Sequence, residues 1–88
     1  MANFTPVSRY LNARAVDHDG EFVGWVRELL IDARDGRVEY VRIELVRPEV
    51  DIPTEIVVPW SAVERDKPGA PMLRIAARRS TLELLAEV

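Results

Sequence analysis

The chain has 88 residues, a mass of 10.0 kDa and a formal net charge of −3. Hydrophobic residues make up 48% and charged residues 31% of it, a balance typical of one globular domain, which excludes a disordered or collagen-like chain. Because cysteine is absent, neither a disulfide framework nor a cysteine-based zinc site can hold the fold together. No apolar run approaches the ~20 residues of a membrane-spanning helix, so we expect no membrane span.

The charge distribution argues against direct nucleic-acid binding. The body of the chain is acidic, and only residues 67–88 carry a small basic excess, which includes Arg78 and Arg79. A nucleic-acid-binding protein usually concentrates basic side chains on one face, because phosphate neutralisation dominates its affinity. We interpret Arg78 and Arg79 as the solvated start of a helix. The N-terminal segment holds no apolar stretch of signal-peptide length, so we expect a cytoplasmic protein.

The first half of the chain has the pattern of consecutive β-hairpins. Residues 13–17 predict a short strand, and Asp17–Gly20 a turn in which aspartates cap amides and the glycine adopts a positive φ. A longer strand is predicted over Phe22–Asp32, a second turn over Ala33–Gly36 and the next strand over Arg37–Val46. Asp-Gly between two apolar runs is a strong hairpin signal, so these strands should pair with each other.

The alternation of apolar and polar residues changes phase within the long strands. In the second of them the apolar parity switches between Tyr40 and Val41, which predicts a β-bulge that keeps the apolar side chains on one side. In the strand predicted over Phe22–Asp32, Val23 and Val26 are both apolar on either side of Gly24, and we interpret Gly24 as the site of a kink. Long strands broken in this way can coil into a small closed barrel.

The second half predicts two more strands and a helix. Prolines among charges make residues 47–55 an exposed excursion, and Glu55–Trp60 reads as a strand that ends near its proline. Another strand is predicted over Met72–Ala76. Ser80–Glu83 has the pattern of a capping box at the start of a short helix that must dock to be stable. The expected fold is therefore mainly β, a small barrel of about five to six strands with bulges and a short C-terminal α-helix.

Four segments of the chain carry a resemblance to a known family: Ala15–Asp32, Asp35–Val41, Val58–Val63 and Ser80–Leu82. The first two resemble the opening of PRC-barrel domains, the third resembles the second signature of that family, and the last fits its closing helix. The resemblance extends over roughly residues 12–86, and the order and spacing of the motifs carry it. The proline-containing excursion departs from the commonest pattern of the family.

The resemblance implies a single small barrel over residues 12–88, preceded by an N-terminal arm of residues 1–11. The family includes the cytoplasmic domain of the photosynthetic reaction-centre H subunit, the C-terminal domain of a ribosome-maturation factor and many short stand-alone proteins. It shares no catalytic residues and no obligatory cofactor. We therefore expect a non-enzymatic adaptor that binds an unidentified protein partner. We also expect it to form a homo-oligomer, with a dimer as the first candidate. The alternatives are an accessory protein of an electron-transfer complex and a ribosome- or RNA-processing-associated factor.

The residue types of catalysis occur only in turn contexts. His18 is the single histidine and lies between two aspartates, where we interpret it as a solvated turn residue rather than a base or metal ligand. Asp17, Asp19 and the following acids superficially match a calcium loop, but Phe22 stands where the loop needs glycine. Asp32 and Asp35 are expected to cap their turn rather than to act as acid and base, and no catalytic, cofactor or metal site is predicted.

Aromatic and large apolar residues provide the candidate protein contacts. The candidates are Phe4, Tyr10, Leu11, Trp25 and Trp60. For the two tryptophans a place in the core or at its margin is one possibility and a partner contact the other. The apolar N-terminal arm either folds over the barrel or reaches a second subunit. We expect self-association through this arm, through residues 47–55, or through both.

Overall fold

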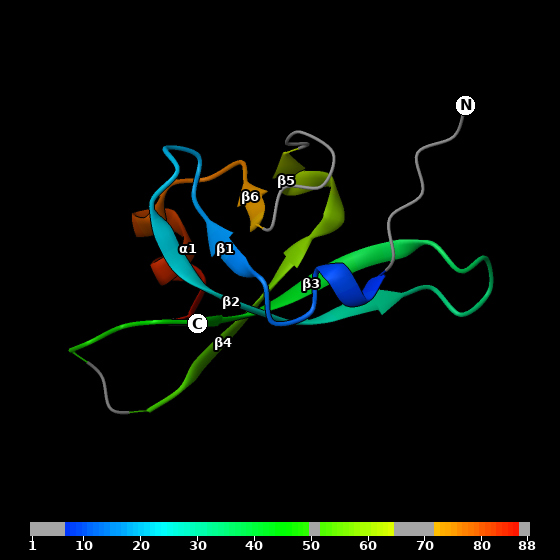
Figure 1. Ribbon diagram of the computed structural model, residues 1–88, viewed down its shortest axis with the longest axis horizontal. Coiled ribbons are helices and arrows are strands. Elements are labelled where there is room, and N and C mark those ends of the chain that lie inside the picture. Colours follow the sequence, from blue (N-terminus) through cyan, green and yellow to red (C-terminus); the bar gives the residue numbers. More distant parts are fainter. Residues whose placement is uncertain (1–6, 50–51, 65–71, 87–88) are drawn as a thin grey trace.

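The computed structural model describes residues 7–49, 52–64 and 72–86. Within them the chain forms six strands, two short 3₁₀ helices and one α-helix (Figure 1). In chain order these are η1 (Val7–Arg9), β1 (Arg14–Val16), β2 (Phe22–Ile31), β3 (Val38–Leu45), β4 (Thr54–Pro59), η2 (Trp60–Ala62), β5 (Val63–Glu64), β6 (Met72–Ile75) and α1 (Arg79–Ala86). The expected mainly β fold with a short C-terminal helix is confirmed.

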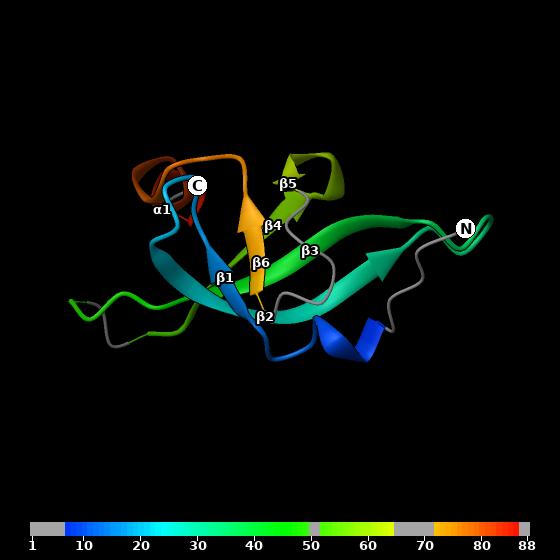
Figure 2. The ribbon, with the colours of Figure 1, turned by 45° about the horizontal axis from the view of Figure 1, so that its top comes forward.

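All six strands belong to one curled sheet with the order β4-β3-β2-β1-β6-β5. Every neighbouring pair is antiparallel except β1 and β6, which run parallel. The sheet curls into a half-barrel with β4 and β5 as its two edge strands. The short helix η2 connects the end of β4 directly to β5 (Figure 2). Within the described residues no ladder joins the two edge strands, so the sheet is a half-barrel rather than a fully hydrogen-bonded cylinder.

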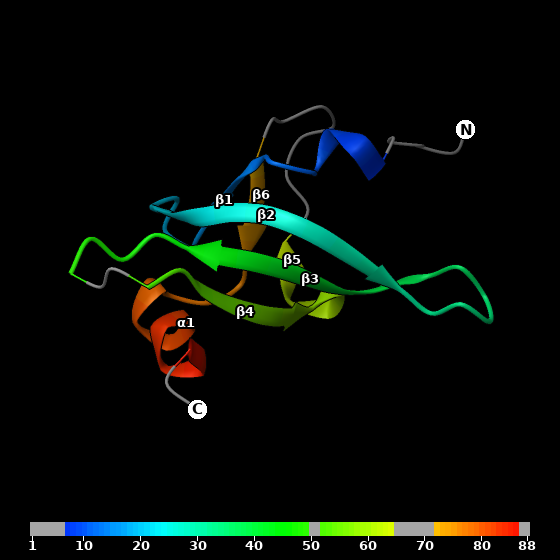
Figure 3. The same ribbon diagram turned by 90° about the horizontal axis from the view of Figure 1, so that it is seen from below.

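The core fills the inside of the curl. Helix α1 lies beside β4 and contributes Leu82, which is 1% exposed (Figure 3). Alternating positions of β3 and β4 face the same space, as the period of two requires. The buried cluster consists of Ala15, Val23, Val26, Val41, Ile43, Leu45, Ile56, Val58, Leu73, Ile75 and Leu82.

The predicted turns have the expected backbone. Gly20 and Gly36 adopt positive φ values of 86° and 74°, a region that residues with a side chain rarely occupy. The carboxylate of Asp32 accepts the Arg34 N–H at 2.8 Å, and that of Asp35 accepts the Arg37 N–H at 3.0 Å. The prediction that these two aspartates cap their turn is confirmed.

The bulge in β3 lies earlier than expected and has a different effect. Leu30 pairs with Tyr40 while Ile31 pairs with Val38, so Glu39 is the extra residue. The register toward β4 is regular from Tyr40 onward. Tyr40 therefore points away from the core with 47% of its surface exposed, and the expectation that a bulge would bring it inward is wrong.

Strand β2 contains the second irregularity and the closest backbone approach. Arg27 has no partner opposite it on β3, so the strand is bulged there. A Cβ atom on Gly24 would lie only 2.1 Å from the carbonyl oxygen of Glu44. Gly24 is thus required because β3 passes too close for any side chain, which refines the predicted kink.

The start of α1 differs from the predicted capping box. The helix begins at Arg79, so Ser80 lies inside it, and Glu83 binds the Arg79 side chain instead of reaching back to a cap. The Arg79 N–H donates to the carboxylate of Asp17 at 3.1 Å. The cap therefore comes from a turn 62 residues earlier, which a local pattern cannot reveal.

Candidate interaction surfaces

One side of strands β1–β4 faces away from the core, and we call it the outer face. Residues directly opposite each other on neighbouring strands share a face, so the register identifies its members. They are Arg14, Trp25, Glu28, Leu30, Tyr40, Arg42, Glu44, Glu55, Val57 and Pro59. Tyr40 and Val57 are each 47% exposed, whereas the intervening positions of β3 and β4 are buried. The outer face thus mixes exposed apolar side chains with charges.

Trp25 lies on the outer face in a cluster of two aromatic rings and one arginine. Its ring meets that of Phe22 edge to face, with centroids 5.2 Å apart. The guanidinium of Arg14 lies 5.6 Å from the Phe22 ring centroid and 5.9 Å from that of Trp25. These are cation–π distances, and such contacts favour a position of the cation beside the rings. Trp25 is half-buried by this cluster and lies outside the core.

Most charges on the outer face are neutralised within the chain. Arg27 reaches Glu44 at 3.2 Å, and Arg42 reaches Glu28 at 3.0 Å. Exposed pairs of this kind contribute ~0–1 kcal/mol each and mainly set the pattern of charge. Arg14 and Glu55 form no ion pair with any residue that the structure describes.

The described part of the N-terminal arm, residues 7–11, packs against the core through Tyr10. Tyr10 meets Trp60 edge to face, with ring centroids 6.0 Å apart, and both pack against the core. The Asn12 N–H donates to the Val26 carbonyl at 2.7 Å, and the Val26 N–H donates to the Ala13 carbonyl at 2.9 Å. Tyr10 therefore makes an intramolecular contact with Trp60, which fits the alternative in which the arm folds over the barrel.

The remaining predicted contact residues are scattered. Leu11 is 39% exposed next to Tyr10, and Phe4 lies outside the described residues. In the excursion, Ile52 is 74% exposed and its carbonyl accepts the Thr54 hydroxyl at 3.2 Å. The structure thus brings Tyr10 and Trp60 together but places Trp25 in a separate cluster.

A hollow of about 380 Å³ adjoins the outer face beside Trp60. It connects the outward-facing Tyr40 with the end of β4, so the outer face continues past the strand ends. Its lining consists of Arg37, Val38, Glu39, Tyr40, Pro59, Trp60 and Ser61.

Asp17 is the one buried charged residue within the described ranges, with 2% of its surface exposed. Burial raises the pKa of its carboxyl, but hydrogen bonds from the Glu21, Arg79 and Asp19 amides lower it, and the pKa ends below its ordinary value. The Glu21 and Asp19 N–H groups both donate to Oδ1 at 2.9 Å. The carboxylate thus joins the first turn to α1.

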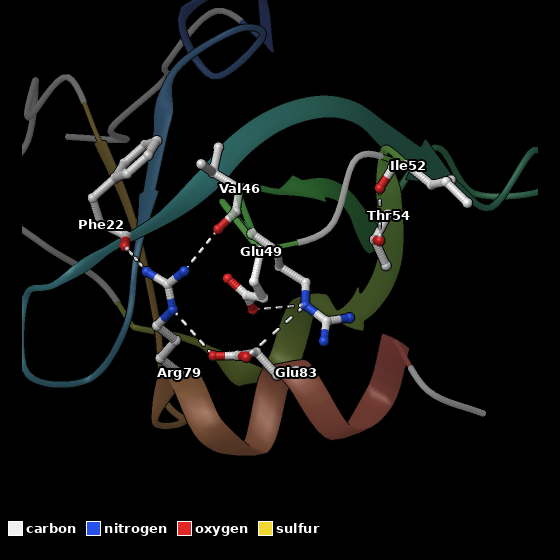
Figure 4. A network of polar contacts seen from close by, with 8 residues as sticks. Phe22, Val46, Glu49, Ile52, Thr54, Arg79 and Glu83 are labelled. Atoms are coloured by element: carbon white, nitrogen blue, oxygen red, sulfur yellow. Dashed lines mark hydrogen bonds and ion pairs between the residues drawn. The ribbon is translucent and has the colours of Figure 1, made fainter.

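Arg79 is a structural clamp that the sequence did not reveal. Its guanidinium donates to the Phe22 carbonyl at 3.1 Å, the Val46 carbonyl at 2.7 Å and the Glu83 carboxylate at 3.1 Å (Figure 4). Arg47 lies 4.0 Å from the same carboxylate. The interpretation of Arg79 as a solvated residue is wrong, because its side chain fastens the helix to β2 and to the end of β3. The one available signal was its position at the start of the only predicted helix.

His18 and the hairpin acids take part in local contacts. The Nδ1 atom of His18 lies 2.7 Å from Glu64, and 60% of the histidine side chain is exposed, as expected for a turn residue. The side chain and backbone N–H of Arg34 lower the pKa of Asp32. Asp32, Asp35 and Glu39 lie with carboxylate oxygens within 4.8 Å of one another on the exposed hairpin. Turn hydrogen bonds already engage the two aspartates.

Comparison with known proteins identifies one family. Residues 4–82 match the family model of the PRC-barrel domain. No curated protein matches the chain. In the part of the chain that the structure describes, no helix has the length and apolar character needed to cross a membrane.

Proposed function

Because the chain belongs to the PRC-barrel family, we propose that it is a non-enzymatic protein-interaction module that associates with a second copy of itself. The side chains that could perform acid–base chemistry support a non-enzymatic role. Asp17 accepts three backbone N–H groups, Asp32 caps a turn, and His18 lies against Glu64. Each of these groups is engaged in a contact within the chain, and the described residues do not bring the three together around one hollow.

The outer face is the observation that carries the proposed binding role. It presents Trp25, Tyr40 and Val57 beside charges, and interfaces are enriched in aromatic residues and arginine. An isolated apolar side chain on a surface is ordinary, whereas several on one regular face favour a partner.

The size of the outer face predicts the strength of the association. Four strands spaced ~4.8 Å apart and at most about six residues of ~3.4 Å give a projected area of no more than ~400 Å². A standard interface covers ~800 Å² on each partner, so we expect transient association with a micromolar dissociation constant.

Sedimentation velocity over a micromolar concentration series tests the proposal. We expect the average mass to rise from 10.0 kDa toward twice that value. Val57→Asp should abolish the rise, because it places a charge on the outer face, while Ile52→Asp in the excursion and Leu11→Asp in the arm serve as matched controls. A 10.0 kDa species at all concentrations would contradict self-association. Loss with Ile52→Asp or Leu11→Asp alone would move the contact to the excursion or the arm.

A further inference from the structure

One cross-strand row of the outer face has an ordered arrangement of charge. Arg14 on β1 is opposite Trp25 on β2, Trp25 is opposite Glu44 on β3, and Glu44 is opposite Glu55 on β4. The row therefore has a cation at one end, two carboxylates at the other and an indole between them. Its ends lie three strand spacings apart, ~14 Å.

Within the described residues, the two end charges of this row form no ion pair. Glu44 is neutralised by Arg27 at 3.2 Å, but neither Arg14 nor Glu55 forms an ion pair with any described residue. The guanidinium of Arg14 lies within cation–π distance of two aromatic rings, and within the described residues its N–H groups donate no hydrogen bond, so they are available to a carboxylate. A cation and a carboxylate at opposite ends of one row form a self-complementary pattern.

We propose that two copies of the chain meet outer face to outer face, so that Arg14 of each copy pairs with Glu55 of the other. This inference rests on the proposed self-association and specifies its orientation. The pairing requires a two-fold axis parallel to the strands and between β2 and β3, because rotation about it places β1 of one copy over β4 of the other. A two-fold axis along the row would instead place Arg14 over Arg14, and like charges in contact are repelled.

The curvature of the sheet fits long charged side chains at the ends of the row. The outer face is the outside of the curl, so two such faces touch along β2 and β3 and diverge toward β1 and β4. Arginine and glutamate are long enough to bridge a widening gap, whereas short side chains are not. At the centre the same axis places Trp25 opposite Glu44 of the other copy. The Trp25 indole N–H, which donates to no acceptor within the described ranges, can donate to that carboxylate.

Charge reversal with mixing tests this orientation directly. Arg14→Glu alone places two carboxylates together at each end of the interface, and Glu55→Arg alone places two guanidinium groups together. Each variant should therefore weaken self-association by about tenfold or more in sedimentation experiments. An equimolar mixture of the two variants restores opposite charges at both ends, so heterodimers should form with an affinity within about threefold of the wild type. The double variant Arg14→Glu/Glu55→Arg should recover in the same way.

Controls separate the orientation from folding and from self-association itself. Arg78→Glu reverses an exposed charge outside the outer face and should leave the affinity unchanged. Arg14→Gln and Glu55→Gln remove charge without reversing it and should weaken association less. Their mixture should recover only in part, because the heterodimer regains one of the two ion pairs. Circular dichroism establishes that every variant is folded. If neither charge reversal changes the dimerisation affinity, or if the mixture associates no more tightly than the single variants, the orientation is overturned but self-association is not. A monomeric wild type would overturn both.

Discussion

Replacing Asp17 by alanine should destabilise the fold more than any other single change of a charged side chain. Its carboxylate accepts backbone N–H groups of Asp19, Glu21 and Arg79, at 2.9, 2.9 and 3.1 Å. A hydrogen bond to a charged group contributes ~1.5–3 kcal/mol, and a buried donor left without a partner keeps the full desolvation cost. The Asp19 amide lies in an exposed turn and can bind water, which leaves two amides. We expect a loss of about 3 kcal/mol, which lowers the melting temperature by roughly 12–24 °C in a domain of this size.

Urea unfolding of wild type, Asp17→Ala and Asp19→Ala measures this effect. Asp19 is the matched control because it is an exposed aspartate in the same turn. The pKa of Asp17 is lowered in the folded state, so its stabilisation is complete above the unfolded pKa of ~3.9 and is lost as pH falls through the folded value. The difference between wild type and Asp17→Ala should therefore be constant near neutral pH and shrink below about pH 4. An equal effect of the two substitutions, or a difference independent of pH in acid, would refute the role of this carboxylate.

Two further substitutions test the packing. Gly24→Ala should cost roughly 2–4 kcal/mol in urea unfolding, because its Cβ would lie 2.1 Å from the Glu44 carbonyl oxygen; a loss below about 0.5 kcal/mol would contradict so close an approach of β3. Trp60→Ala removes the edge-to-face contact with Tyr10 and should cost ~2–3 kcal/mol, with little effect on self-association. Trp25→Ala should weaken self-association with only a small loss of stability. If Trp60→Ala weakened self-association and Trp25→Ala mainly lowered stability, the assignment of the two surfaces would be wrong.

The strands could be predicted because their signals are local. The Val- and Ile-rich runs alternate with a period of two, and Asp-Gly turns separate them, so Phe22–Ile31 and Val38–Leu45 lie within one residue of the expected bounds. The phase slip correctly indicated a bulge in β3, but the extra residue is Glu39. A parity change constrains a bulge to a neighbourhood only, because the partner strand decides which residue is left unpaired.

The features missed at the sequence level depend on distant partners. Strand β5 has two residues, too few for any periodic pattern. The cap of α1 comes from Asp17, and the Arg79 clamp reaches Phe22, 57 residues away. The candidate residues were chosen for their type, yet Tyr10 and Trp60 meet each other while Trp25 meets Arg14. Residue type indicates a capacity for contact, whereas strand register decides which side chains share a surface.

The two tryptophans permit one spectrum to locate the association. Each contributes a single indole N–H resonance in a proton–nitrogen correlation spectrum, and Trp25→Phe and Trp60→Phe assign them. Association through the outer face predicts that the Trp25 resonance shifts progressively as the protein is concentrated through the micromolar range, while the Trp60 resonance, packed against Tyr10, stays in place. A Trp60 resonance that moves while that of Trp25 does not, or two resonances that ignore concentration, would contradict the outer face as the site where two copies meet.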